Sequence, residues 1–76
     1  MSDVRVFVNG VGIEIARDKT ALDAVARVDR AEAEEVAAGR RMITDSRGLS
    51  LPPRSAVFAG AIFRTVRAKP STEGVE

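Results

Sequence analysis

The chain opens on an alternating pattern of apolar and polar residues. Residues 4–8 place valine at every even position, the period-two pattern of a strand with one buried face. Asn9-Gly10 follows, and because both residues tolerate a positive φ, this pair favours a two-residue hairpin turn. Alternation resumes over residues 12–16, so we predict a second strand that returns antiparallel to the first.

The pattern then changes to a helical period. Either Thr20 or Asp18 can cap a helix, and Asp23 stands three residues after Thr20, close to a capping box with a shorter acid. The spacing of the apolar residues that follow predicts a helix over about residues 20–29. Its apolar stripe consists of Leu22, Val25, Ala26 and Val28.

An alanine- and glutamate-rich run occupies residues 31–38. Its helix propensity is high, but Val36 is its one large apolar residue. The run forms either a second short helix or a continuation of the first after a kink. Gly39 stands where a glycine commonly ends a helix.

Short strands and turns fill the second half of the chain. Residues 41–44 predict a third strand, followed by a turn over residues 45–48. Residues 49–51 predict a very short strand that ends at Pro52-Pro53, since proline cannot donate to a strand ladder. Residues 61–67, rich in β-branched and aromatic side chains, predict the last strand.

The remaining segments complete the domain organisation. Residues 55–60 connect the last two strands, and we expect Val57 and Phe58 in this connection to be buried. Residues 69–76 have the small and polar composition of a flexible C-terminal tail. The folded domain is therefore expected to span residues 1–68.

The order of these elements is that of an α+β roll. The last strand is long and apolar, so it has to pair centrally, and the first strand is its natural neighbour. This arrangement resembles the β-grasp (ubiquitin-like) fold, a mixed sheet of four or five strands with one main helix packed on one face. Within that superfamily the chain is most similar to the small sulfur carriers of thiamine and molybdopterin synthesis. The likeness is carried by the hairpin at residues 4–10, the cap and helix at residues 18–25, and Gly60 before residues 62–66.

The resemblance implies chemistry at the C-terminus. Those carriers, like ubiquitin, end in Gly-Gly, and an activating enzyme adenylates the terminal carboxylate before it becomes a thiocarboxylate or is joined to a lysine. Glycine is needed because the tail threads a narrow channel with its backbone close to the nucleotide. This chain has Pro70-Ser71 at the corresponding place, and its only tail glycine is Gly74. A carrier or modifier role therefore requires processing to Gly74.

Composition argues against an enzyme. The 76 residues include no cysteine and no histidine, which removes the thiol nucleophile, the thiolate metal site and the usual general base. A chain of this length also has little room for an enclosed active site beside its core. We predict a non-enzymatic protein that uses no cofactor and no metal.

Charge is distributed unevenly along the chain. The net charge is +1, but residues 1–38 carry five basic and eight acidic side chains, and residues 39–76 carry seven and three. Ten of the twelve cations are arginine, the residue suited to bidentate contact with carboxylate or phosphate. A GC-rich genome explains this bias more simply. Nucleic acid is a disfavoured partner because the chain has no Trp or Tyr for base stacking and no Lys/Gly-rich loop.

Two observations bear on location. The start of the chain does not resemble a signal peptide. The longest apolar stretch, residues 56–63, is too short to span a bilayer. We therefore expect a cytoplasmic protein without a membrane partner.

The last strand defines a candidate protein-binding surface. Phe63 has to face the helix, because the opposite arrangement would bury Arg64 as an unpaired charge. The open face of the sheet then carries apolar side chains framed by arginines, as protein-binding surfaces do, and ubiquitin-like domains commonly bind through this face. The alternatives are that the tail or a second copy of the chain covers it. The candidate site residues are Arg5, Phe7, Arg41, Ile62, Arg64 and Val66.

Three other signals have simpler structural explanations. Residues 10–12 contain two glycines but join two strands, so a hairpin turn is favoured over a phosphate loop. The three glutamates within residues 32–35 indicate a solvated helix face rather than a cation site, although such a face could form half of a docking surface. Ser46 and Ser55 have no base in a catalytic pattern and are expected to serve in turns.

Overall fold

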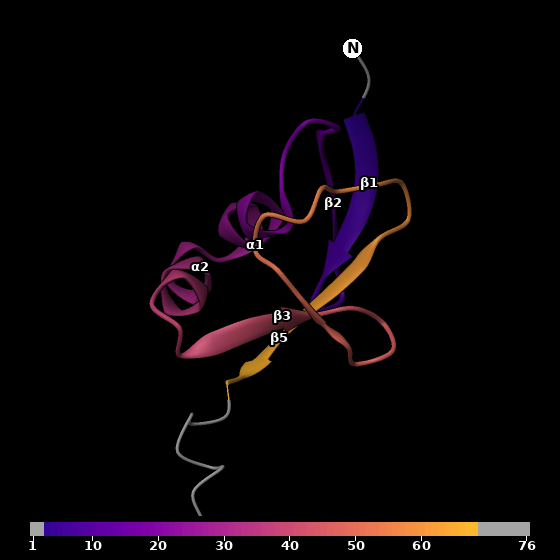
Figure 1. Cartoon of the computed structure of the whole chain (residues 1–76). Helices are drawn as coiled ribbons and strands as arrows, with labels where there is room; N and C mark the ends of the chain where they lie inside the picture. The colour runs from indigo at the N-terminus through magenta and orange to yellow at the C-terminus, as the bar shows by residue number, and fades with distance from the viewer. Residues whose placement is uncertain (1–2, 69–76) are drawn as a thin grey trace, which may run out of the picture.

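The structure is a computed structural model that describes residues 3–68. A hairpin is followed by two helices and three further strands (Figure 1). The elements are β1 (Asp3–Val8), β2 (Val11–Ala16), α1 (Ala21–Val28), α2 (Arg30–Ala37), β3 (Arg41–Thr44), β4 (Ser50–Leu51) and β5 (Ile62–Arg67). No helix among these residues is long and apolar enough to cross a membrane.

The strands form one mixed sheet in the order β2-β1-β5-β3-β4. The pairing of β1 with β5 is parallel, and every other pairing is antiparallel. The last strand therefore lies at the centre beside the first, as predicted. Both helices lie on one side of the sheet (Figure 1). The fold is α+β with a β-grasp-like topology.

The first hairpin forms as its sequence predicts. Asn9 and Gly10 adopt φ values of 50° and 87°, the left-handed geometry that a two-residue turn between twisted strands requires. The turn sets the register of β1 against β2, in which Val6 lies opposite Ile13. Val6 and the other even-numbered residues of β1 are buried.

Two eight-residue helices cover the sheet, so the glutamate-rich run is a second short helix. Thr20 and Asp23 form a complete capping box at the start of α1. Asp29 is extended, ends α1 and caps α2 with its side chain, which separates the two helices. Gly39 follows α2 with a φ of 86°, as a helix-ending glycine does.

The buried side of α1 includes Ala21 and Ala24, which the predicted stripe lacks, and excludes Ala26, which the stripe contains. Ala21, Ala24 and Val25 are buried, whereas Ala26 is exposed. Ala21, Ala24, Val25 and Val28 follow the i, i+3, i+4, i+7 spacing of one helix face. The small alanines let α1 lie close to β1 and β2.

A single core fills the space between the sheet and the helices. Phe63 is its largest member, with 1% of its surface exposed, and faces the helices as predicted. The buried apolar residues are Val4, Val6, Val8, Ile15, Ala21, Ala24, Val25, Ala33, Val36, Ile43, Val57, Ala61 and Phe63.

The prediction that Phe58 is buried is wrong, whereas that for Val57 is confirmed. Val57 has 4% of its surface exposed and Phe58 has 61%. The backbone N–H of Val57 donates to the carbonyl of Lys19, and the Phe58 carbonyl accepts from Ala61 in a tight turn. Val57 is thereby held against the core, and the next side chain points to solvent.

The opposite environments of Phe63 and Phe58 give a matched test of the fold. Phe63→Ala is expected to lower the free energy of unfolding by about 3–5 kcal/mol, because it opens a cavity in the core. Phe58→Ala is expected to change it by no more than about 0.5 kcal/mol. Urea unfolding of both variants measures the difference, and equal losses would contradict this placement of the two rings.

Candidate functional site

The uncovered side of the sheet gathers five residues that we call the sheet-face patch. Phe7 lies in register with Ile62 across the parallel β1–β5 pair. Met42 lies opposite Val66 across the antiparallel β3–β5 pair. Arg64 stands between these two apolar pairs on β5, so the sheet-face patch consists of Phe7, Met42, Ile62, Arg64 and Val66.

The apolar side chains of the patch remain accessible to a partner. Ile62 is 42% exposed and Val66 is 39% exposed, while Phe7 and Met42 are half-buried. Neighbouring side chains on one face of a strand are about 7 Å apart. The two apolar pairs therefore lie roughly 13 Å apart along β5, with Arg64 midway.

Gly12 provides room beside Phe7 on the neighbouring strand. A Cβ atom at Gly12 would lie 3.1 Å from Cε2 of Phe7 and 3.0 Å from Nη1 of Arg5. Both contacts are tighter than ordinary van der Waals packing. A side chain at this position would therefore displace the Phe7 ring or the Arg5 guanidinium.

Arg5 borders the sheet-face patch on β1, as expected. Its Nη2 lies 3.1 Å from Oε2 of Glu14 on β2, and both side chains are more than half exposed. An exposed pair of this kind contributes little to stability. It does supply Arg5 with a carboxylate from the chain itself.

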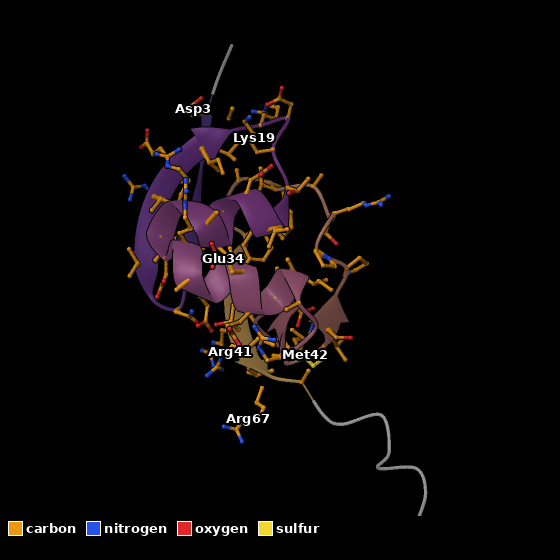
Figure 2. The ribbon with its side chains drawn as sticks, turned by 90° about the vertical axis from the view of Figure 1, so that its left-hand side faces the viewer. Asp3, Lys19, Glu34, Arg41, Met42 and Arg67 are labelled. Atoms are coloured by element: carbon orange, nitrogen blue, oxygen red, sulfur yellow. The ribbon has the colours of Figure 1, made fainter. Side chains whose placement is uncertain are left out.

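Arg41 does not frame the open face, and this part of the site prediction is wrong. Arg41 is two residues from the buried Ile43 on β3, so both side chains point to the helix side. Its Nε lies 3.1 Å from Oε2 of Glu32 on α2. Arg41 also lies opposite Arg67 at the end of the sheet where β3 begins and β5 ends (Figure 2).

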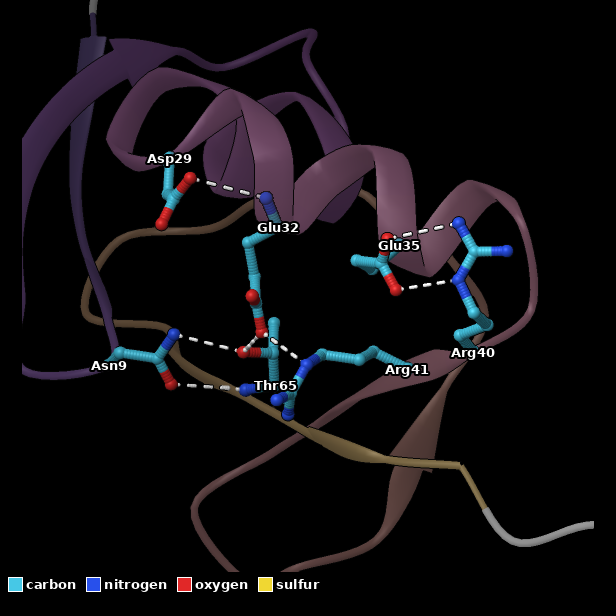
Figure 3. A network of polar contacts seen from close by, with 7 residues as sticks. All are labelled: Asn9, Asp29, Glu32, Glu35, Arg40, Arg41 and Thr65. Atoms are coloured by element: carbon cyan, nitrogen blue, oxygen red, sulfur yellow. Dashed lines mark hydrogen bonds and ion pairs between the residues drawn. The ribbon is translucent and has the colours of Figure 1, made fainter.

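Glu32 is the centre of a polar network on the helix side (Figure 3). Its Oε2 also accepts a 2.6 Å hydrogen bond from the Thr65 hydroxyl. The Asn9 side chain donates to that hydroxyl and accepts from the Thr65 backbone N–H. The network ties α2 to β3, β5 and the first hairpin, so Glu32 has a structural role.

Glu34 and Glu35, the other glutamates of α2, are not arranged to bind a cation. Glu35 accepts two hydrogen bonds from Arg40, at 2.7 and 3.0 Å, which hold the pKa of Glu35 below its ordinary value. Glu34 is exposed. No group of three or more acidic residues within residues 3–68 is arranged to hold a metal ion.

The surface around the patch contains residues that the sequence did not predict to be part of a binding site. A groove of about 680 Å³ is lined by Met42, Leu49 and Val66, among others. A hollow of about 270 Å³ is lined by residues that include Phe58 and Ile62. Leu49 is 58% exposed, so apolar surface continues beyond both ends of the patch. The sequence places Leu49 in a predicted short strand and predicts Phe58 to be buried, so it gave no signal that either side chain is exposed beside the patch.

The β3–β4 turn forms one wall of the smaller hollow. The Asp45 carboxylate accepts hydrogen bonds from the backbone N–H groups of Leu49 at 3.0 Å and Arg47 at 2.8 Å. The bond from Leu49 is the main cause that lowers the pKa of Asp45. Ser46, within this turn, is exposed, and its position fits the expected role in a turn.

Comparison of the chain with protein-family models, with curated proteins and with solved structures finds no match in any of the three. The fold is therefore established by the topology described above. Gly74, the attachment residue of the carrier hypothesis, and the predicted tail at residues 69–76 lie outside the described residues.

The Asp45 turn predicts a specific dependence of stability on pH. A carboxylate whose pKa is lowered on folding stabilises the fold above its unfolded-state pKa, and this contribution is lost as the pH falls through the folded-state value. Asp45→Asn is expected to be less stable than the wild type at neutral pH, with the difference shrinking in acid. Urea unfolding of both proteins from neutral to acidic pH measures this difference in the free energy of unfolding. A difference that stays constant with pH would contradict the role of the charge, and Ser46→Ala serves as a non-titrating control in the same turn.

Proposed function

We propose that this protein is a small, non-enzymatic interaction module that binds a protein partner through the sheet-face patch. The observation that carries the proposal is a sheet with helices on one face only, whose other face exposes Ile62 and Val66 beside Phe7 and Met42. Exposed apolar side chains that gather on one face, with polar residues around them, mark binding surfaces.

The surroundings of the patch support a protein as the partner. Interfaces between proteins combine an apolar centre with arginine and with a polar rim. Arg64 and Arg5 supply the arginines, and Glu14 is part of the rim. The hollows lined by Met42 and by Phe58 offer space for a partner's side chains.

Replacing the apolar centre of the patch is expected to abolish binding. The double variant Phe7→Ser/Ile62→Ser removes two neighbouring side chains from the proposed contact, and the loss of central interface residues typically weakens binding by 2 kcal/mol or more, about 30-fold. The measurement is affinity capture from the source cells followed by binding of the purified, identified protein. Circular dichroism and thermal unfolding verify that the variant is folded.

Val11→Ser is the matched control. Val11 is 48% exposed, but it lies opposite the buried Val8 and faces the helix side. Its replacement is expected to leave binding unchanged. A partner retained by the folded double variant, or lost equally in Val11→Ser, would overturn the proposal.

The second candidate function is a sulfur-carrier-like or ubiquitin-like modifier. The β-grasp-like topology favours this function, since β5 is central and parallel to β1 and is followed by the C-terminal segment. The chain leaves the sheet beside Arg40, whose backbone carbonyl accepts a hydrogen bond from the Ala68 N–H. In this proposal, processing exposes Gly74 and an activating enzyme modifies its carboxylate.

Intact mass of the protein from its own cells separates the two functions. A carrier is expected to end at Gly74, or to show that mass raised by the exchange of one oxygen for sulfur. A binding module is expected to function after truncation behind Ala68. A mass corresponding to the full chain through Glu76 would contradict the carrier function.

A further inference from the structure

Arg64 is the one charged residue within the sheet-face patch. Along β5 it lies between Ile62 and Val66 on the same face of the sheet, and it lies opposite Thr44 on the neighbouring strand β3. No carboxylate within residues 3–68 pairs with its guanidinium. The open side of the sheet therefore carries a cation among apolar side chains, without a counter-ion from the described part of the chain.

Three other arginines on or beside the sheet do pair with a carboxylate, whereas Arg67, at the far end of β5, has no ion pair with a carboxylate of residues 3–68. Arg5 pairs with Glu14, Arg40 with Glu35 and Arg41 with Glu32. In water an unpaired surface arginine is well solvated. A partner that covers the patch removes that water, and an unpaired charge buried in an interface costs several kcal/mol.

We infer that the partner presents an aspartate or glutamate to Arg64, with apolar side chains on both sides of that acid. This inference rests on the proposed function and names the chemistry of its partner. The apolar groups contact the Phe7/Ile62 pair at one end and the Met42/Val66 pair at the other. Their separation of roughly 13 Å, with the acid midway, follows from the spacing of alternate residues along β5. Arginine suits this contact because its planar guanidinium can bind a carboxylate through two hydrogen bonds.

A second copy of the chain fits the patch less well. In a two-fold contact centred on Arg64, the two guanidinium groups would face each other, and juxtaposed like charges oppose binding. Glu14, an acid on the open face beside the patch, already pairs with Arg5. A nucleic-acid phosphate could pair with Arg64, but Phe7 is the only aromatic side chain of the patch, and single strands bind through several stacking platforms.

The test selects random linear peptides, displayed on phage, for binding to the immobilised protein. The enriched peptides are expected to contain Asp or Glu flanked by apolar residues. Replacing that acid by its amide in a synthetic peptide is expected to weaken binding to the wild type roughly 30-fold. The same replacement is expected to have little effect on binding to Arg64→Gln.

Arg54→Gln is the matched control. Arg54 is exposed and lies in the connection whose Pro53 and Ser55 carbonyls accept from the first turn of α1, on the helix side. The dependence on the peptide's acid is expected to persist in this variant. Chemical-shift changes at the amides of Ile62 and Val66 verify that the peptide occupies the patch.

The other outcomes separate this inference from the proposed function. Peptides that bind the patch without an acid, or equally well to Arg64→Gln, would overturn the inference and leave the proposed function in place. If the enriched peptides still bind Phe7→Ser/Ile62→Ser, they do not occupy the patch. This result, or the absence of any enriched peptide, would count against both the inference and the proposed function. Dimerisation lost in Ile62→Ser would replace the acidic partner with a second copy. Binding of a single-stranded oligonucleotide that Arg64→Gln weakens would assign Arg64 to a phosphate.

Discussion

The parallel pairing of β1 with β5 is the contact on which the rest of this structure depends. The Phe7 N–H donates to the Ala61 carbonyl and the Asn9 N–H to that of Phe63, both at 2.9 Å. Parallel strands require a long crossover connection, and here the crossover contains both helices, β3 and β4. Because both helices pack on one face, the core lies on that side and the sheet-face patch is left uncovered. The same pairing joins Phe7 to Ile62, which come from opposite ends of the sequence.

Ion pairs form on both faces of the sheet, since Arg5 and Glu14 pair on the open side. On the helix side, Glu32 binds both Arg41 and Thr65, so it compensates a cation and orders a polar side chain at the edge of the core. On the open side, Arg64 lies between Ile62 and Val66 and opposite Thr44, and no carboxylate within residues 3–68 pairs with it. The fold therefore supplies a counter-ion to Arg41, the one arginine within residues 3–68 from which its own packing removes part of the water. It leaves Arg64 without one where only a partner would remove that water.

Much of this architecture follows from local patterns. Strict alternation in β1 is compatible with one register only, since a shift by one residue would bury Arg5 and expose Val6. The same reasoning correctly orients β5, because Phe63 and Arg64 differ so strongly in their cost of burial. β3 lacks this contrast: Met42 and Ile43 are both apolar, so the pattern cannot tell which of them faces the core. Arg41 was assigned to the wrong face for that reason.

The sequence by itself determined the hairpin, the capping box of α1, the glycine that ends α2, the order of the strands and the orientation of the two central strands. Each of these depends on strong local preferences or on a large difference in burial energy. Tertiary structure alone decided which face carries Arg41, that Met42 joins the patch and that Phe58 points to solvent. These features depend on the register of β3 against β5 and on the turn that begins at Phe58. Both are set by contacts between residues far apart in the chain, which no local pattern encodes.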